Sequence, residues 1–396
     1  MSTSAGSPPL SEPGPAPRRL GVVVNPTAGK GRAASAGLGI LAGLRRAGHD
    51  VVDLTAPDAG AALARARRAV DGTVGVGGRG APVDALVVVG GDGMVHLGAQ
   101  AVAGTGVPLG IVPVGTGNDF AATLELPVRD PASAGAALCR ALDAGPAGLR
   151  SLDAAFATGP GLEPGGRWLA GAVSAGLDAA VNARANRLRH PRGSARYTVA
   201  AALELVRYRP WSYRLTFDGV ADLDDHPALL AVASRGGRRS ADGRVDGGAR
   251  GPRRSRAGDV LHLSPGPAGT ATWTGRAALV TAANGPRIGG GIRVAPGASL
   301  DDGLLDVLVA TDLSRPGALA VFPSMFTGGH VRRRKVHVVR ARAVTIEPGP
   351  DAWVAGERAL PVAHADGERL GPLPLRVEAR ARALQVLVAP GRGTGA

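Results

Sequence analysis

The chain has 396 residues, 44% of them hydrophobic, so it is long enough to form two or three domains with substantial cores. Its formal net charge of +14 comes almost entirely from arginine, because Lys30 and Lys335 are its only lysines. A basic chain can bind nucleic acid, anionic membranes or acidic small molecules. Aromatic residues make up only 3% of the chain, too few for platforms that stack on single strands, so we expect no nucleic-acid partner.

The cysteine content and the N-terminal sequence indicate the cellular compartment. Cys139 is the only cysteine, which excludes an internal disulfide and suits a reducing compartment. No apolar run reaches the ~18 residues that span a bilayer, and residues 1–17 lack the basic start and apolar centre of a signal peptide. We therefore expect a cytoplasmic protein with a disordered leader over residues 1–17 and a tail over residues 391–396.

Strand and helix signals alternate in the first part of the chain. Short apolar runs rich in valine end at polar or glycine residues, which is typical of buried parallel strands. The expected strands are Leu20–Val24, Val51–Leu54, Val87–Val89 and Leu109–Val112; the expected helices are Ala33–Ala47, Ala59–Val70 and one that begins near Met94; Gly72–Pro82 is an expected loop. This order predicts a parallel α/β layer.

After Arg150 the pattern changes to β-rich segments around one helical region. The expected strands are Trp168–Val173, Tyr213–Phe217, Ala228–Ala233 and Ala277–Ala282, and the helical region is Asp178–Arg207. The change in composition places a domain boundary near Ala144–Gly148. We therefore expect an α/β domain over residues 18–146 and a β-rich domain over residues 147–390, whose last strand can pack back on the first domain.

Two arginine-rich segments stand out. Arg235–Arg256 contains eight arginines and two aspartates in a Gly-rich, polar stretch that cannot pack a core, so we expect a disordered insert. Arg332–Lys335 is a second basic run. Each segment has two interpretations: a solvated loop, or a polybasic contact with anionic lipid headgroups worth ~1 kcal/mol per basic residue.

Three glycine-rich turns follow predicted strands: Asn25–Gly31, Gly90–Gly93 and Gly115–Asp119. Ligands of α/β units gather at the carboxyl ends of the strands, where glycine lets the backbone approach an anion closely. Lys30 and Thr116 can contact terminal phosphates, and Asp92 can hold the accompanying Mg²⁺ directly or through water. The turns therefore predict a nucleotide-phosphate site that is neither a P-loop nor a protein-kinase site.

In their order and spacing, these turns resemble the diacylglycerol kinase catalytic domain shared by bacterial lipid kinases and sphingosine kinases, and more distantly NAD kinase. The likeness continues over roughly residues 20–390 through Ser174–Asp178, Asn284-Gly285 with Gly289–Gly291, Asp301–Asp306 and Asp366–Glu368. The resemblance implies an α/β domain with an NAD kinase-like parallel sheet, a β-sandwich domain and a cleft between them.

The resemblance also implies roles for individual residues. The nucleotide would be bound by the strand-end residues Asn25, Pro26, Thr27, Ala28, Gly29, Lys30, Thr55, Gly90, Gly91, Asp92, Gly93, Met94, Val95, His96 and Thr116. Glu368 would be the general base that takes the proton from the lipid hydroxyl. Asp153 would be the catalytic aspartate near that hydroxyl, and Asp92 the catalytic aspartate of the nucleotide's Mg²⁺. A structural Mg²⁺ would be held by Asp302 and the carbonyls of Ser299 and Leu304.

Some of these residues also have plainer interpretations. Glu368 and Asp302 both lie in good turn sequences, and Thr55 can be an ordinary strand-end hydroxyl. Many bacterial members have Thr at position 94 and Asn-Glu at positions 96 and 97, where this chain has Met94, His96 and Leu97. We expect His96 to lie on the helix surface rather than to act as an acid or a metal ligand.

Together, the motifs predict an ATP- and Mg²⁺-dependent lipid kinase that phosphorylates a hydroxyl of diacylglycerol or a related lipid alcohol. Its lipid substrate would lie at an anionic surface on the inner face of the membrane, where the enzyme would be peripheral, and it can form a homodimer. A sphingosine-type kinase, another lipid kinase and an NAD kinase are the enzymatic alternatives. The other alternative is an inactive kinase scaffold that binds anionic membranes or nucleic acid.

Overall fold

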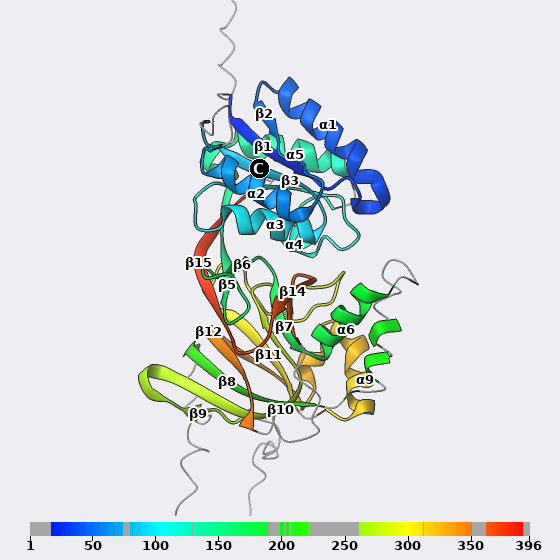
Figure 1. The fold of residues 1–396 in the computed structure, drawn as a ribbon, viewed down its shortest axis with the longest axis vertical. Coiled ribbons are helices and arrows are strands. Elements are labelled where there is room, and N and C mark those ends of the chain that lie inside the picture. Colours follow the sequence, from blue (N-terminus) through cyan, green and yellow to red (C-terminus); the bar gives the residue numbers. More distant parts are fainter. Residues whose placement is uncertain are drawn as a thin grey trace, which may run out of the picture.

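The computed structural model describes residues 17–73, 80–128, 130–188, 190, 199–201, 203–205, 208, 210–221, 261–311, 313–350 and 362–390. The expected leader up to residue 16, the tail, the insert Arg235–Arg256 and the strand Ala228–Ala233 lie outside the described residues. Within them, a 15-stranded sheet runs through an elongated molecule, from a parallel α/β part at one end to an antiparallel part at the other (Figure 1).

The N-terminal part is the predicted parallel layer. Its strands are β1 (Arg19–Val24), β2 (Asp50–Asp53), β3 (Ala85–Gly90) and β4 (Leu109–Pro113), in the order β4-β3-β1-β2. Its helices are α1 (Arg32–Arg46), α2 (Ala59–Val70), α3 (Asp92–Val102), α4 (Asp119–Thr123) and α5 (Pro131–Asp143), with 3₁₀ turns η1 (Ala28–Gly31) and η3 (Gly145–Gly148). β1, β3 and β4 are buried along nearly their whole lengths, which explains their apolar sequences, whereas the edge strand β2 has an exposed aspartate at each end.

Alternate strand residues separate two cores in this part. Val22 and Val87 pack with α1 and α5 on one face, whereas Val23 and Val88 pack with α2 and α3 on the other. The helix predicted at Ala59–Val70 is confirmed with these bounds. It begins there because Asp58 caps it, accepting a hydrogen bond from the Ala61 N–H at 2.8 Å.

The C-terminal part is antiparallel. Its strands are β5 (Leu149–Thr158), β6 (Arg167–Leu169), β7 (Ala172–Gly176), β8 (Trp211–Val220), β9 (Ser264–Pro265), β10 (Thr270–Ala283), β11 (Leu305–Thr311), β12 (Val336–Pro348), β13 (Ala363–Ala365), β14 (Glu368–Gly371) and β15 (Leu375–Leu387). Its helices are α6 (Leu177–Arg187) and α9 (Arg315–Met325), with 3₁₀ turns η4 (Pro267–Gly269) and η5 (Gly329–Arg332). None of the helices among the described residues is long and apolar enough to cross a membrane.

The strand predicted at Trp168–Val173 is wrong as one element, since the chain forms β6 and β7 with a break at Ala170-Gly171. The break has a physical cause. The N–H of Gly171 donates to the Asp366 carboxylate at 3.3 Å, and a Cβ at Gly171 would lie 2.2 Å from that carboxylate. The strand is therefore interrupted where the backbone of Gly171 binds the Asp366 side chain, which lies 195 residues later in the sequence.

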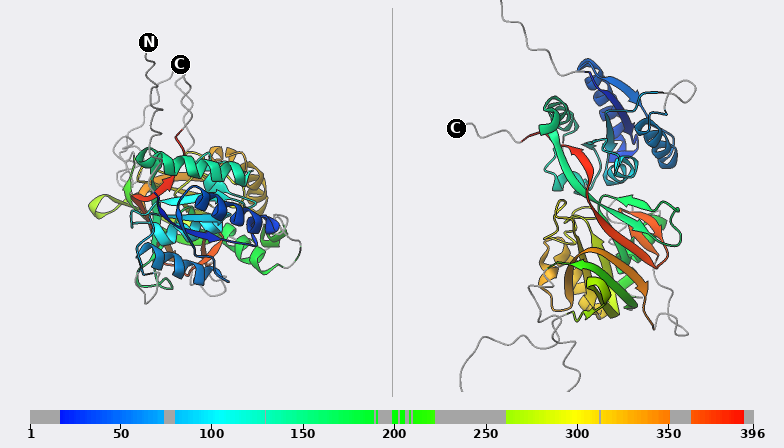
Figure 2. Two further views of the ribbon diagram at one scale, coloured as in Figure 1. Left: turned by 90° about the horizontal axis from the view of Figure 1, so that it is seen from above. Right: turned by 90° about the vertical axis from the view of Figure 1, so that its left-hand side faces the viewer.

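Two long strands join the parts. β5 and β15 pair antiparallel along most of their lengths, and β15 also pairs parallel with β4 at Val386 and Leu109 (Figure 2). The Gly104 N–H after α3 donates to the Ala383 carbonyl of β15 at 2.7 Å. These contacts place the turn between β13 and β14 close to α3, which sets the geometry of the site.

Candidate functional site

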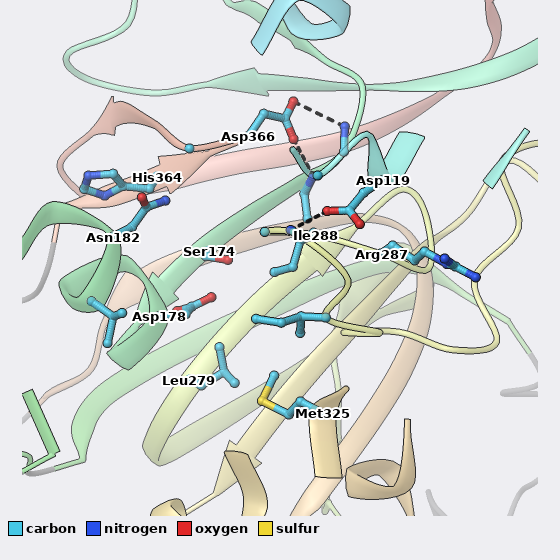
Figure 3. Close-up of a pocket in the computed structure, with 18 of the residues that line it drawn as sticks. Asp119, Ser174, Asp178, Asn182, Leu279, Arg287, Ile288, Met325, His364 and Asp366 are labelled. Carbon is cyan, nitrogen blue, oxygen red and sulfur yellow. Dashed lines mark hydrogen bonds between the residues drawn. The ribbon is translucent and has the colours of Figure 1, made fainter. Parts of the chain in front are cut away.

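A cavity of about 970 Å³ is lined by residues from both parts of the molecule. The N-terminal part contributes residues of α3, of the segment between β4 and α4, and of α4 itself: Asp92, Val95, Thr116, Gly117, Asp119, Phe120 and Thr123. In Figure 3, Asp119 and Asp366 lie at one end of the pocket, and Leu279 and Met325 lie at the other. α6, α9, β10 and β11 supply most of the apolar wall: Leu177, Val181, Leu279, Ala310, Val321, Phe322 and Met325.

The glycines of the two central turns allow their backbones to touch. A Cβ on Gly90 would lie 2.4 Å from Cγ of Met94, and a Cβ on Gly115 would lie 2.5 Å from Cα of Gly91. A Cβ on Gly117 would lie 2.7 Å from the Asp92 Oδ2. Because side chains at these positions would collide, the glycines bring the end of β3 and the end of β4 together around Asp92.

Asp92 and Asp119 form a pair of partly or fully buried carboxylates at the polar end of the cavity. Burial, and next the charge of Asp119, raise the pKa of Asp92 from 3.8 to about 6. Burial also raises the pKa of Asp119, whose Oδ2 accepts a hydrogen bond from the Gly290 N–H at 2.6 Å. Neighbouring carboxylates with raised pKa values attract a cation, and their oxygens suit Mg²⁺.

The first glycine turn, which follows β1, lies beside the turns after β3 and β4, since β1 neighbours β3 in the sheet. The Asn25 Oδ1 accepts hydrogen bonds from the N–H and hydroxyl of Thr27 at 3.1 and 2.8 Å. Gly29 has φ +59°, and a Cβ there would lie 2.2 Å from the Val114 carbonyl oxygen. Pro26, Ala28 and the Lys30 backbone belong to the same turn, so the structure brings all three predicted phosphate turns to one sheet edge.

The hydroxyl of Thr55 accepts a hydrogen bond from the Val24 N–H at 3.1 Å. This is the strand-end role that the sequence also allowed, and it holds the end of β1 in place. A nucleotide contact by Thr55 stays a prediction.

The position of His96 corrects an expectation. We expected it on the helix surface, but its side chain is only 1% exposed. Its Nδ1 lies 2.9 Å from Oδ2 of Asp366, and its Nε2 lies 3.1 Å from the NH2 nitrogen of Arg167. The helix is apolar nearly all round, so α3 is buried on almost every side, and its one histidine is buried with it.

Glu368, the predicted base, begins β14 and is about half exposed. Its Oε2 accepts a hydrogen bond from the Arg167 guanidinium. Glu368 does not line the cavity, whereas Asp366 and Gly367 do. The predicted base therefore lies next to a residue of the cavity wall, Gly367, but not in the wall itself.

Asp153, the third predicted catalytic carboxylate, is buried in β5 and also lies off the cavity lining. Its Oδ1 accepts a hydrogen bond from the Arg382 N–H at 2.8 Å, and its Oδ2 accepts one from the Gly303 N–H at 2.6 Å. Both oxygens thus bind backbone and fasten the turn before β11 to β15. A catalytic role for Asp153 stays a prediction.

The predicted structural Mg²⁺ site lies in this turn. Asp302 accepts a hydrogen bond from the Leu304 N–H at 3.0 Å with Oδ1, while the Arg340 guanidinium contacts Oδ2 at 2.5 Å. The Ser299 hydroxyl donates to Asp301 instead. In the part of the chain that the structure describes, no three His, Cys, Asp or Glu side chains cluster as a metal site. One carboxylate with carbonyl oxygens still suits Mg²⁺, but the ion would compete with Arg340 for Asp302, so this site stays a prediction.

Sequence reasoning missed Asp119, Asp366 and Arg167 as residues of the site. Asp119 and Asp366 stand inside motifs already noted, Gly115–Asp119 and Asp366–Glu368, so their chemistry was visible but their roles were not. No pattern in the sequence marks Arg167, whose partners lie 71 and 201 positions away.

The chain is similar to known proteins over both of its parts. Residues 19–144 match the diacylglycerol kinase catalytic domain, and residues 171–244 and 267–388 match the YegS C-terminal NAD kinase beta sandwich-like domain. The Mycobacterium tuberculosis (strain H37Rv) protein named diacylglycerol kinase is 32% identical over 374 residues, 93% of this chain and 94% of that protein. A Xanthomonas axonopodis pv. citri protein named "Probable lipid kinase YegS-like" is 28% identical over 267 residues, 66% of each chain.

Solved structures resemble the fold. A diacylglycerol kinase structure from Bacillus anthracis str. Sterne has a TM-score of 0.54 and 18% identity, covering 94% of this chain and 97% of that one. The matches confirm a two-domain architecture with an N-terminal catalytic domain and a C-terminal β-sandwich-like domain.

Proposed function

Because the chain belongs to the diacylglycerol kinase family and is therefore a lipid kinase, we propose that it transfers the γ-phosphate of ATP to a hydroxyl of diacylglycerol or a related lipid alcohol. The cavity carries this proposal. Its polar end is lined by residues of two of the three phosphate-type turns, and the rest of its wall is mostly apolar. A lipid alcohol needs both environments, one for its reacting hydroxyl and one for its chains.

The turns after β1, β3 and β4 would hold the nucleotide phosphates through backbone N–H groups, as helix N-termini and glycine turns bind anions. Asp92 and Asp119 would hold the Mg²⁺ that accompanies ATP, which when bound would neutralise phosphate charge. Phosphoryl transfer depends mainly on positioning and charge stabilisation, so the cavity between the two parts would act as the cleft in which the two substrates meet.

We assign proton removal from the lipid hydroxyl to Glu368. Its carboxylate binds Arg167 in this arrangement and lies off the cavity wall. A general base must come within hydrogen-bond reach of the proton or act through one water. Proton transfer therefore requires Glu368 to leave Arg167 or to work through a water on the cavity side of the turn.

The lipid would enter from a membrane surface beside α9. Phe326 lines the cavity, is 47% exposed and packs edge-on against Phe322 at 5.8 Å between ring centroids, while Leu319 is 61% exposed. The basic run Arg332–Lys335 follows closely in the chain and suits anionic headgroups. We therefore propose that the enzyme is peripheral to an anionic membrane and takes its lipid at this end.

The function is tested by incubating the protein with labelled ATP, Mg²⁺ and vesicles that carry diacylglycerol, monoacylglycerol, sphingosine, ceramide or polyprenol, with NAD in a parallel reaction. We expect label in the diacylglycerol product. Phosphorylated sphingosine alone would assign a different lipid class, and phosphorylated NAD without any lipid product would overturn the proposal.

Filling the apolar wall should weaken lipid use selectively. Val321 on α9 is buried and lines the cavity, so V321W would occupy space proposed for a lipid chain. Overfilling costs about 1–3 kcal/mol, so we expect the KM for lipid to rise about 10-fold or more. The KM for ATP should stay within about twofold by the same reasoning, because the nucleotide turns are untouched.

The matched control is L38W, which adds the same side chain on the exposed surface of α1. Steady-state kinetics with each substrate varied in turn measure both constants. An equal rise in both KM values, or none in the lipid KM, would contradict the assignment of the apolar wall.

A further inference from the structure

His96 connects two parts of the proposed active site that are far apart in the sequence. It lies on α3, one turn after the Gly90–Gly93 loop, and its Nδ1 is 2.9 Å from Oδ2 of Asp366 in the turn between β13 and β14. Both side chains are shielded from solvent, with exposures of 1% and 9%. A contact between buried polar groups is worth more than one at the surface, because neither partner can turn to water instead.

Arg167 contacts the other ring nitrogen of His96. The guanidinium can only donate hydrogen bonds, and its NH2 nitrogen lies 3.1 Å from Nε2 of His96. Nε2 of His96 thus faces the Arg167 guanidinium, and Nδ1 faces the Asp366 carboxylate. The same Arg167 nitrogen also donates to Glu368. One guanidinium thus contacts both His96 and the predicted base.

Asp366 is held as an anion in this arrangement. Burial alone would raise its pKa, but hydrogen bonding and charge from His96, together with the N–H groups of Ala172 and Gly171, bring the pKa below its usual value. Asp366 also adopts a left-handed backbone conformation with φ 48°. The turn Asp366–Glu368 is therefore fastened at its first residue by His96 and at its last residue by Arg167.

We propose that His96 is a positioning residue that holds the Asp366–Glu368 turn against α3, so that the glycine loop proposed for nucleotide and the predicted base keep a fixed relation. It does not line the cavity, so it acts through Asp366 and Arg167 rather than on substrate. The inference rests on the proposed lipid kinase function. It also gives a role to one of the residues that differ from the commoner bacterial pattern, since an Asn side chain can offer an N–H where Nδ1 stands in histidine.

The test compares His96→Leu, His96→Asn, Asp366→Asn and the double variant His96→Leu/Asp366→Asn. We expect His96→Leu to lower kcat about 10- to 100-fold, in line with loss of alignment at a reacting centre, while both KM values stay within about threefold. His96→Asn should recover kcat to within about fivefold of the parent, and the double variant should lose no more than about twofold beyond the worse single variant, because contacting residues are not additive.

His330→Leu is the matched control. His330 is fully buried in the C-terminal part, with Nε2 2.9 Å from the Val294 carbonyl oxygen, and it has no place in the proposed site. This variant should lower Tm while leaving kcat within about twofold of the parent, since a purely structural histidine affects folding and not alignment. An equal kcat loss in the two Leu variants, or no recovery in His96→Asn, would overturn the proposal.

Hydrogen exchange separates this inference from the proposed function. Amides of residues 366–371 should exchange at least about 10-fold faster in His96→Leu than in the parent, and His96→Asn should reverse most of the change, since a lost contact lowers local opening free energy. This result does not depend on any lipid being phosphorylated. An inactive parent would refute the lipid kinase assignment alone, whereas unchanged exchange at residues 366–371 would refute the positioning role alone.

Discussion

Replacing Asp92 by asparagine is expected to reduce lipid phosphorylation by at least about 100-fold while making the fold more stable above pH 6. The activity loss follows because D92N removes one of the two carboxylates proposed to hold the nucleotide's Mg²⁺, and losing one charge-stabilising group typically costs 10²–10³ in kcat. The gain in stability follows because the same carboxylate is partly buried beside Asp119, so that its ionised form is unfavourable in the folded protein.

The sign of the pH effect follows from the pKa of Asp92, which the fold raises from 3.8 to about 6. The folded state binds this proton more tightly than the unfolded state. The proton's favourable contribution to the free energy of unfolding is therefore complete below pH 3.8 and is lost as pH rises to about 6. A difference of roughly two pKa units corresponds to at most about 3 kcal/mol. Asparagine does not titrate, so the free energy of unfolding of D92N should rise relative to that of the parent protein across this interval.

Denaturant unfolding at pH 4, 5, 6 and 8, without nucleotide or divalent ions, measures this effect. D130N is the control, because hydrogen bonds from Ser133 and Ala132 lower the pKa of the exposed Asp130, so its effect has the opposite sign and appears as pH falls. If the stability of the parent and of D92N depends on pH in the same way, the ionised form of Asp92 does not destabilise the folded protein, and the prediction is wrong.

Local sequence pattern predicted the N-terminal sheet well, since its strands are apolar runs bounded by glycine or polar residues, and β1, β3 and β4 contribute residues to the cores on both faces. The helix Ala59–Val70 is confirmed, and Val87–Val89 lies inside β3. The break between β6 and β7 was not predictable in the same way. It depends on the N–H groups of Gly171 and Ala172 binding Asp366, about 195 residues later, and no local pattern contains that partner.

In the candidate site, too, the features set by local sequence could be predicted and those set by distant residues could not. The glycine turns could be predicted because close backbone approach requires glycine wherever the turn lies. The environment of their side chains could not, because the raised pKa of Asp92 depends on burial and on Asp119 from the next turn. His96 shows a signal that was present but misjudged: α3 is apolar nearly all round, which indicates a helix buried on most sides. A polar residue in such a helix needs a partner, and here the partners are Asp366 and Arg167.

Replacing Glu368 by glutamine should lower kcat about 10²- to 10⁴-fold, the range in which general bases contribute, and should leave ATP affinity unchanged within about threefold. The substitution is informative because glutamine keeps a carbonyl oxygen that can accept the hydrogen bond from Arg167. The turn should therefore stay in place, and the loss reports the missing negative charge rather than a displaced loop.

Single-turnover phosphorylation and calorimetric ATP binding measure the two quantities separately for E368Q. The companion variant R167L removes the guanidinium that holds Glu368 and contacts His96, so it should disturb the turn while leaving the carboxylate present. If Glu368 is the base, E368Q loses far more activity than R167L. Full activity in E368Q with a large loss in R167L would instead mean that the turn matters for position alone, and that another carboxylate that lines the cavity, such as Asp92 or Asp366, must take the proton.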